Sequence, residues 1–168
     1  MTLIVNTNYT IVNFTKNSKF HAWRVVNDVV MGGRSTSTIG IDLNGNAVFK
    51  GNVSLENNGG FSSLRHRFEK IDVSKFKTIK IRLKGDGKKY QFRAKSSIFN
   101  QHSYVNYFQT NGDWQTIEIN LSNLSPTFRG RILDMPNFRG NQLEEIGFLI
   151  GNKTNESFKL MIDSIILG

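Results

Sequence analysis

Three polar stretches that contain glycine hold the residue types best suited to recognising a ligand. They read Asn-Asp-Val-Val-Met-Gly-Gly-Arg-Ser at 27–35, Asn-Asn-Gly-Gly-Phe-Ser-Ser at 57–63 and Lys-Gly-Asp-Gly-Lys-Lys-Tyr at 84–90. Glycine allows backbone angles and close approaches that side chains forbid. Tight turns need the first property, and a surface that receives a ligand or partner often needs the second.

The first stretch has two interpretations. As a recognition loop, Asp28 would accept hydrogen bonds while Gly32 and Gly33 expose backbone N–H groups. Arg34 would add a charged fork for an acidic group. As a structural turn, Asp28 would instead cap its own backbone. Met31 is a candidate contact residue, although its type favours filling the core or its rim.

The second stretch resembles an anion-binding nest of backbone N–H groups. Its candidate contact residues are Asn57, Asn58, Gly59, Gly60, Phe61 and Arg65. It does not fit a dinucleotide fingerprint, because no helix follows it and no parallel crossover is visible. A structural turn is the first interpretation here, and contact with a ligand or partner is the second.

A long turn-rich segment at 122–142 contains both prolines and a repeated Phe-Arg-Gly sequence. Its Arg129 and Arg131 are candidate contact residues, since guanidinium groups can hold a carboxylate, a phosphate or an acidic partner. Long loops in compact domains are usually functional. Trp23 is also a candidate contact residue: its ring could lie in the core, or it could be exposed and stack on a sugar or a partner.

Catalytic and metal chemistry have little support in the sequence. The chain has no cysteine, and its three histidines lack metal-ligand spacing. Ser62 and Ser63 lack a nucleophile elbow, and the 13 acidic residues form no acid–base pair by spacing. We therefore predict a non-enzymatic protein without cofactor or metal. The folded chain could still assemble a carboxylate pair, or a calcium site near Asp163.

The formal net charge of +9 indicates a basic surface. Because no run of five basic residues occurs, this favours a solvated surface over a nucleic-acid site. The N-terminal segment 1–6 has an apolar run too short for a signal peptide or a membrane span, and it lacks the arginine-rich, amphipathic character of a mitochondrial presequence. We expect a cytoplasmic protein that does not span a membrane.

Alternating apolar and polar residues predict an all-β protein with little helix. The candidate strands are 10–14, 23–26, 35–41, 47–55, 61–68, 79–84, 90–95, 104–109, 114–121, 146–150 and 158–166. The glycine-bearing turns at 44–45, 85–87 and 111–113 predict hairpins between successive strands. Short helical turns are expected at 73–76 and 141–145. The pattern predicts one β-sandwich domain over 1–168.

The ordered motifs resemble the complex I intermediate-associated protein 30 family. The matching features are Trp23, 27–35, 49–55, 56–65, 83–90, Trp114, 126–131 and 146–150. The resemblance covers about residues 20–166. It implies a jelly-roll β-sandwich of the galactose-binding-domain-like type, and mitochondrial members of the family help to assemble respiratory complex I.

Three functions follow from these observations. The first is a binding module whose 28–35, 57–61 and Arg129 loops form a face for a protein partner. The second is a carbohydrate-binding module, because the implied fold often carries sugars. The third is an enzyme acting on a small polar or sugar substrate, which would need two carboxylates facing each other across a cleft.

Overall fold

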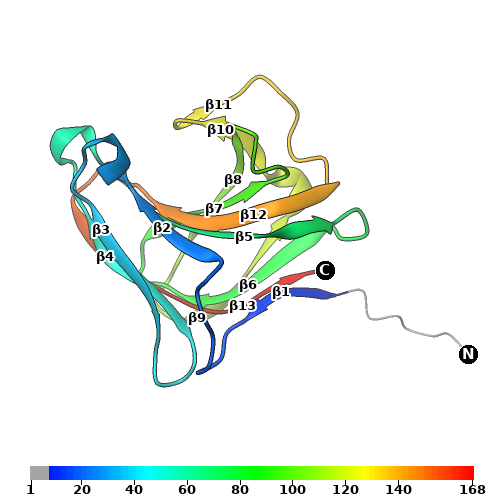
Figure 1. The fold of residues 1–168 in the computed structure, drawn as a ribbon, viewed down its shortest axis with the longest axis horizontal. Coiled ribbons are helices and arrows are strands. Elements are labelled where there is room, and N and C mark those ends of the chain that lie inside the picture. Colours follow the sequence, from blue (N-terminus) through cyan, green and yellow to red (C-terminus); the bar gives the residue numbers. More distant parts are fainter. Residues whose placement is uncertain (1–7) are drawn as a thin grey trace, which may run out of the picture.

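Two antiparallel sheets pack face to face in the computed structural model, which describes residues 8–168 (Figure 1). The 1–6 segment considered above as a leader lies outside the described residues. The six-stranded sheet has the order β3 (Thr36–Ile41), β4 (Ala47–Val53), β13 (Glu156–Leu167), β6 (Thr78–Lys84) and β9 (Trp114–Asn120), with β1 (Tyr9–Asn13) paired to β13.

The seven-stranded sheet forms the second layer. Its order is β11 (Arg131–Ile132), β10 (Ser125–Phe128), β8 (Ser103–Gln109), β7 (Lys89–Lys95), β12 (Gln142–Ile150), β5 (Ser62–Asp72) and β2 (Trp23–Asn27). Three short 3₁₀ helices interrupt the chain: η1 (Asp28–Met31), η2 (Glu56–Asn58) and η3 (Leu121–Asn123). The prediction of an all-β sandwich with little helix is confirmed.

The core lies between the two sheets because alternate residues of each strand are apolar. The six-stranded sheet contributes Ile79, Ile81 and Leu83 of β6, which are completely buried. The seven-stranded sheet contributes Phe92 of β7 and Phe148 of β12, which are also completely buried. The residues between them on each strand therefore point away from the core, and on the seven-stranded sheet they form its outer face.

Two of the three predicted hairpins are wrong. Strands β6 and β7 lie in different sheets, and so do β8 and β9. The turns at 85–87 and 111–113 therefore carry the chain across the sandwich. The alternation of apolar and polar residues in these strands could not reveal this, because a strand that buries one face has the same pattern in either sheet. The turn at Gly45, where φ is +84°, does join β3 and β4 as a hairpin.

The segment at 122–142 contains structure that the sequence did not predict. Strands β10 and β11 form a hairpin whose turn residues Arg129 and Gly130 both have positive φ. Such angles are typical of a two-residue hairpin turn. The helical turn expected at 141–145 is wrong, because β12 begins at Gln142. At 73–76 there is one turn, closed by the Phe76 N–H on the Val73 carbonyl.

Candidate functional site

Asp28 joins the two glycine-bearing loops beside β2. Its buried carboxylate accepts hydrogen bonds from the backbone N–H of Ser35 at 2.9 Å and from the Ser35 hydroxyl at 2.5 Å. It also accepts bonds from the N–H groups of Gly60 at 2.6 Å and Phe61 at 3.2 Å. These donors outweigh the effect of burial, which alone would raise the pKa of Asp28, and they lower that pKa.

The predicted anion nest at 57–61 is therefore occupied by the chain's own carboxylate. Asn57 and Asn58 both have positive φ, and the turn that they form directs the next N–H groups toward Asp28. A Cβ on Gly59 would lie 2.5 Å from the Asp28 carboxylate, and one on Gly33 would overlap it. Gly33 and Gly59 thus allow close packing around Asp28, whereas Gly32 is exposed and an added Cβ there would have no other atom within 4 Å.

The other predicted residues near these loops are either buried or exposed at the rim. Trp23 is 8% exposed and stacks on His66, with ring centroids 4.3 Å apart, on the inner side of the sheet. Gly32 ends η1 in the left-handed conformation. Met31 is 61% exposed, and Arg34 lies 3.5 Å from Glu56 in an exposed ion pair between the two loops.

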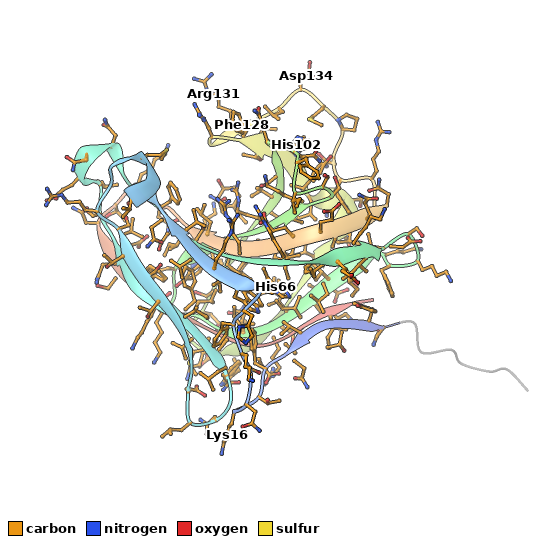
Figure 2. The ribbon with its side chains drawn as sticks, viewed as in Figure 1. Lys16, His66, His102, Phe128, Arg131 and Asp134 are labelled. Atoms are coloured by element: carbon orange, nitrogen blue, oxygen red, sulfur yellow. The ribbon has the colours of Figure 1, made fainter. Side chains whose placement is uncertain are left out.

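The predicted arginines of the third loop stand apart from the first two. Arg129 lies over the ring of Phe128, 5.2 Å from its centroid, and Arg131 is exposed on β11. The β10–β11 hairpin rises on one side of the outer face of the seven-stranded sheet, and the η1 and η2 loops rise on the opposite side (Figure 1). Figure 2 shows Arg131 at the hairpin, away from the strands beneath it.

Arg65, the remaining predicted residue, lies between these walls on the outer face. Strand pairing places Arg24, Arg65, Gly147 and Arg93 in one row across β2, β5, β12 and β7. The adjoining outer row contains Arg67, Glu145 and Lys95. We call the five cations Arg24, Arg65, Arg67, Arg93 and Lys95 the cationic face.

Glu145 is the carboxylate at the centre of the cationic face. Its side chain is 5% exposed, and it accepts a hydrogen bond from Arg67 Nε at 2.8 Å. A guanidinium nitrogen of Arg24 lies 3.7 Å from the same oxygen. Five cations therefore surround one carboxylate, and the face retains an excess of positive charge.

Burial lowers the pKa values of three of these cations. The pKa of Arg93 falls to about 10, first because of burial and then because of the nearby charge of Arg65. Burial also lowers the pKa values of Arg65 and Lys95, and neighbouring cations lower them further although Glu145 acts in the opposite direction. The pKa of about 10 leaves Arg93 charged at neutral pH, and the lowered pKa values of all three groups indicate like charges held together with incomplete compensation.

A neutral polar network continues the face along β7 and β8. Gln91 accepts a hydrogen bond from Arg93 at 2.7 Å and donates one to the Tyr107 hydroxyl at 3.3 Å. Tyr107 is 53% exposed, and the Lys89 ammonium lies 4.6 Å from its ring centroid. The face therefore combines cations, an amide and an accessible aromatic ring.

Sequence reasoning found Arg65 but missed the rest of the cationic face. The alternation of β7 did place Arg93 and Lys95 on a side away from the core. What it could not show is that β2, β5 and β7 lie close together on either side of β12. The predicted loops form the two walls of this face, while the strands between them supply most of its charge.

Several solved structures, among them carbohydrate-binding modules, have the same fold. A family 11 carbohydrate-binding module of a cellulosomal cellulase from Clostridium thermocellum superposes with a TM-score of 0.69, at 18% identity, over 95% of this chain and 93% of the module. A family 29 carbohydrate-binding module gives a TM-score of 0.57 at 10% identity, over 96% of this chain and 91% of that module. The chain has this jelly-roll, galactose-binding-like fold.

The sequence identifies the family to which the chain belongs. The model of the complex I intermediate-associated protein 30 family matches residues 12–162, and the chain belongs to that family. A mouse relative, complex I intermediate-associated protein 30, mitochondrial, is 26% identical over 90% of this chain. The chain spans 53% of the length of that relative. Its mitochondrial name does not support the cytoplasmic localisation expected from the sequence.

Two further observations concern metals and membranes. Within residues 8–168, no group of three or more His, Asp or Glu side chains is arranged to hold a metal ion. No helix in the same part of the chain is long and apolar enough to cross a membrane.

Proposed function

We propose that this chain is a non-enzymatic binding module that receives a protein partner on its cationic face. The observation that carries the proposal is the gathering of five cations around one carboxylate on the outer face of a sheet. An excess of positive charge at this density favours a negatively charged surface and speeds its approach. The two loop walls would limit the directions from which a partner can reach the sheet.

Family membership supports a protein partner. The mouse relative is named for its association with an intermediate of complex I, and an assembly intermediate is itself a protein. We propose the same class of role for this chain: to hold an assembling protein by an acidic surface. The matched region is the binding domain in this proposal, since the family model covers nearly all of the described residues.

The composition of the site favours binding over catalysis. Glycosidic hydrolysis typically needs two carboxylates on either side of the bond. Among the residues that line the hollow at the centre of the cationic face, Glu145 supplies a carboxylate and the other charged groups are Arg65, Arg93 and Lys95. Glu145 is itself held by Arg67, so it already has a structural role.

An affinity pull-down from the source cells, read by mass spectrometry, tests the proposal. The wild type is compared with Arg65→Ala/Arg93→Ala. A matched control is Lys50→Ala/Lys159→Ala, which removes an exposed, cross-strand pair of like charges from the six-stranded sheet. We expect a partner that is retained by the wild type and the control and lost by the first variant, and that binds again as a purified protein. A partner retained equally by all three proteins would show that the cationic face is not the binding surface.

A carbohydrate ligand is the second candidate. The structural neighbours that are carbohydrate-binding modules favour it, and so does the exposed ring of Tyr107 beside Gln91 on the same face. Sugar rings stack on aromatic side chains, and amides bind their hydroxyl groups. A glycan array that includes neutral β-glucans and acidic polysaccharides tests this candidate. Specific binding that Tyr107→Ala abolishes would support it, and an array without signal would remove it.

A further inference from the structure

The cations of the cationic face fall into two groups. Arg67 and Arg24 have a carboxylate partner, because both approach the same oxygen of Glu145. Arg65 and Arg93 lie in the same row as Arg24, and neither has an ion pair within the described residues. Glu145 thus pairs with Arg67 and Arg24 and leaves Arg65 and Arg93 without a direct carboxylate contact.

A small hollow separates Arg65 from Arg93. Gly147 is the residue between them on β12, directly opposite each arginine in the strand register. Because glycine has no side chain, nothing rises from the central strand at this point. The hollow has a volume of about 10 Å³, which is room for roughly one water molecule or one carboxylate oxygen. Lys95 and Ser103 also line it.

Both arginines are partly buried, and this strengthens their interaction with an anion. Burial lowers the pKa values of both groups, and Arg65 further lowers that of Arg93. An anion placed between them would offset the repulsion. Guanidinium groups bind carboxylates in a planar, two-point geometry that a lysine cannot reproduce.

We propose that Arg65 and Arg93 form an anion site that holds one carboxylate of an acidic segment of the partner, seated over Gly147. This inference rests on the proposed function and adds the chemical group that is recognised. Gln91 positions Arg93 by accepting its hydrogen bond at 2.7 Å. Glu145 also lines the hollow, so its charge opposes a second carboxylate there, while Arg67 and Arg24 approach its oxygen and offset that charge.

Fluorescence anisotropy with a labelled glutamate decapeptide tests the site directly. The uncharged probe is the corresponding glutamine decapeptide. The variants are Arg65→Met/Arg93→Met, which keeps the apolar stems, and the control Lys50→Met/Lys159→Met. We expect the first variant to bind the glutamate peptide at least about tenfold more weakly than the wild type, because it loses the charge-assisted hydrogen bonds of both guanidinium groups to the carboxylate. The control should lose less than about threefold.

Two more variants separate a site from a general effect of charge. Arg67→Met removes the cation that Glu145 already holds, so it should weaken binding less than Arg65→Met does. Glu145→Gln removes the competing carboxylate and should strengthen binding. Thermal melts confirm that each variant is folded, and an arginine variant that does not fold is replaced by the corresponding lysine substitution, which keeps the charge and removes the two-point geometry. Equal losses for Arg65→Met, Arg67→Met and the control would overturn the site.

The source of the carboxylate is tested by adding polygalacturonate as a competitor. The proposal is supported if the unlabelled glutamate decapeptide displaces the labelled one at lower concentrations than polygalacturonate does. Stronger binding of polygalacturonate overturns an acidic protein segment as the occupant. The two proposals can fail separately. A partner protein that still binds Arg65→Met/Arg93→Met leaves the protein-binding function standing and removes this site. If peptide binding needs both arginines but no partner protein is found, the anion site stands and the protein-binding function loses its support.

Discussion

Two neighbouring regions of this molecule treat buried charge in opposite ways. The Asp28 carboxylate accepts hydrogen bonds from Ser35, Gly60 and Phe61, so donors within the chain stabilise its charge. On the cationic face, Arg65 and Arg93 lie on either side of a glycine, and neither forms an ion pair with a carboxylate within residues 8–168. The first region uses its charge within the fold, and the second is where we propose that a partner's carboxylate binds.

The comparison separates residue type from available charge. Asp, Asn and Gly residues in loops suggest ligand recognition, and here the Asp28 carboxylate accepts hydrogen bonds from N–H groups of the chain itself. The arginines that remain available sit in ordinary alternating strands, where a sequence reads them as a solvated face. Unsatisfied charge, which depends on what the fold brings close, distinguishes the two regions better than residue type does.

Replacing Asp28 should have the largest effect on stability. Asp28→Ala would leave the N–H groups of Ser35, Gly60 and Phe61 without their acceptor. Because each orphaned buried donor costs about 1–3 kcal/mol, we expect a loss of about 3–5 kcal/mol in the free energy of unfolding. Urea unfolding followed by circular dichroism measures it.

The same variant tests whether the two regions have separate roles. In conditions where Asp28→Ala is folded, its affinity for the glutamate peptide should stay within about threefold of wild type, since the arginines are untouched. A stable Asp28→Ala protein that loses peptide binding would instead make Asp28 part of the recognition site.

A methyl group beside the Asp28 carboxylate should have the next largest effect. In Gly33→Ala the new Cβ would overlap the carboxylate, so the loop must shift and stability should fall by about 1–3 kcal/mol. The matched control is Gly40→Ala in β3, where a new Cβ would have no other atom within 4 Å and φ is not positive. That change should be neutral or slightly stabilising. Equal losses at both glycines would mean that the Asp28 contacts do not constrain the first loop.

Acid should weaken the Asp28 region without removing it. Hydrogen bonds lower the pKa of folded Asp28 below its usual value of 3.8. A carboxylate with a lowered pKa contributes stability that is fully present above about pH 4 and is lost as the pH falls through the folded value. The effect should be smaller than that of Asp28→Ala, because the protonated group still accepts hydrogen bonds.

The acid effect is measured as a difference between wild type and Asp28→Asn. Asp42 and Asp72 also have lowered pKa values, but both proteins contain them, so their contributions cancel. The stability gap between the two proteins should be constant at about pH 5–7 and narrow below about pH 4. A gap that stays constant down to about pH 3 would mean that ionised Asp28 contributes nothing beyond its neutral form.

Sequence reasoning reached the fold more fully than the site. Alternation located the strands, because burial of one face leaves a period of two in residues such as Ile79, Ile81 and Leu83. It failed on connections, since nothing local distinguishes the β6–β7 crossing from a hairpin. It also failed on the cationic face, because Arg93 and Arg65 are 28 positions apart in the chain and meet only through β12.

The smallest predicted effect is an increase in stability when a cation is removed from the cationic face. Arg65 is partly buried, and the charges of Arg24 and Arg67 oppose its own while Glu145 favours it. Its lowered pKa means that the charged form is less favourable here than in water. Arg65→Met keeps the apolar stem, so it should raise the free energy of unfolding by about 0.5 kcal/mol at low ionic strength.

Salt distinguishes this effect from a simple gain in packing. Added sodium chloride screens repulsion between cations, so the advantage of Arg65→Met should shrink as ionic strength rises toward about 1 M. Lys159→Met on the exposed six-stranded sheet is the control and should show less dependence on salt. If Arg65→Met were less stable than wild type by more than about 1 kcal/mol at every ionic strength, Arg65 would be a structural residue like Asp28. A loss of stability in Arg65→Met would mean that the cationic face, like the Asp28 region, stabilises the fold. A gain of stability together with a loss of peptide binding is the result expected if Arg65 serves a partner at some cost to the fold.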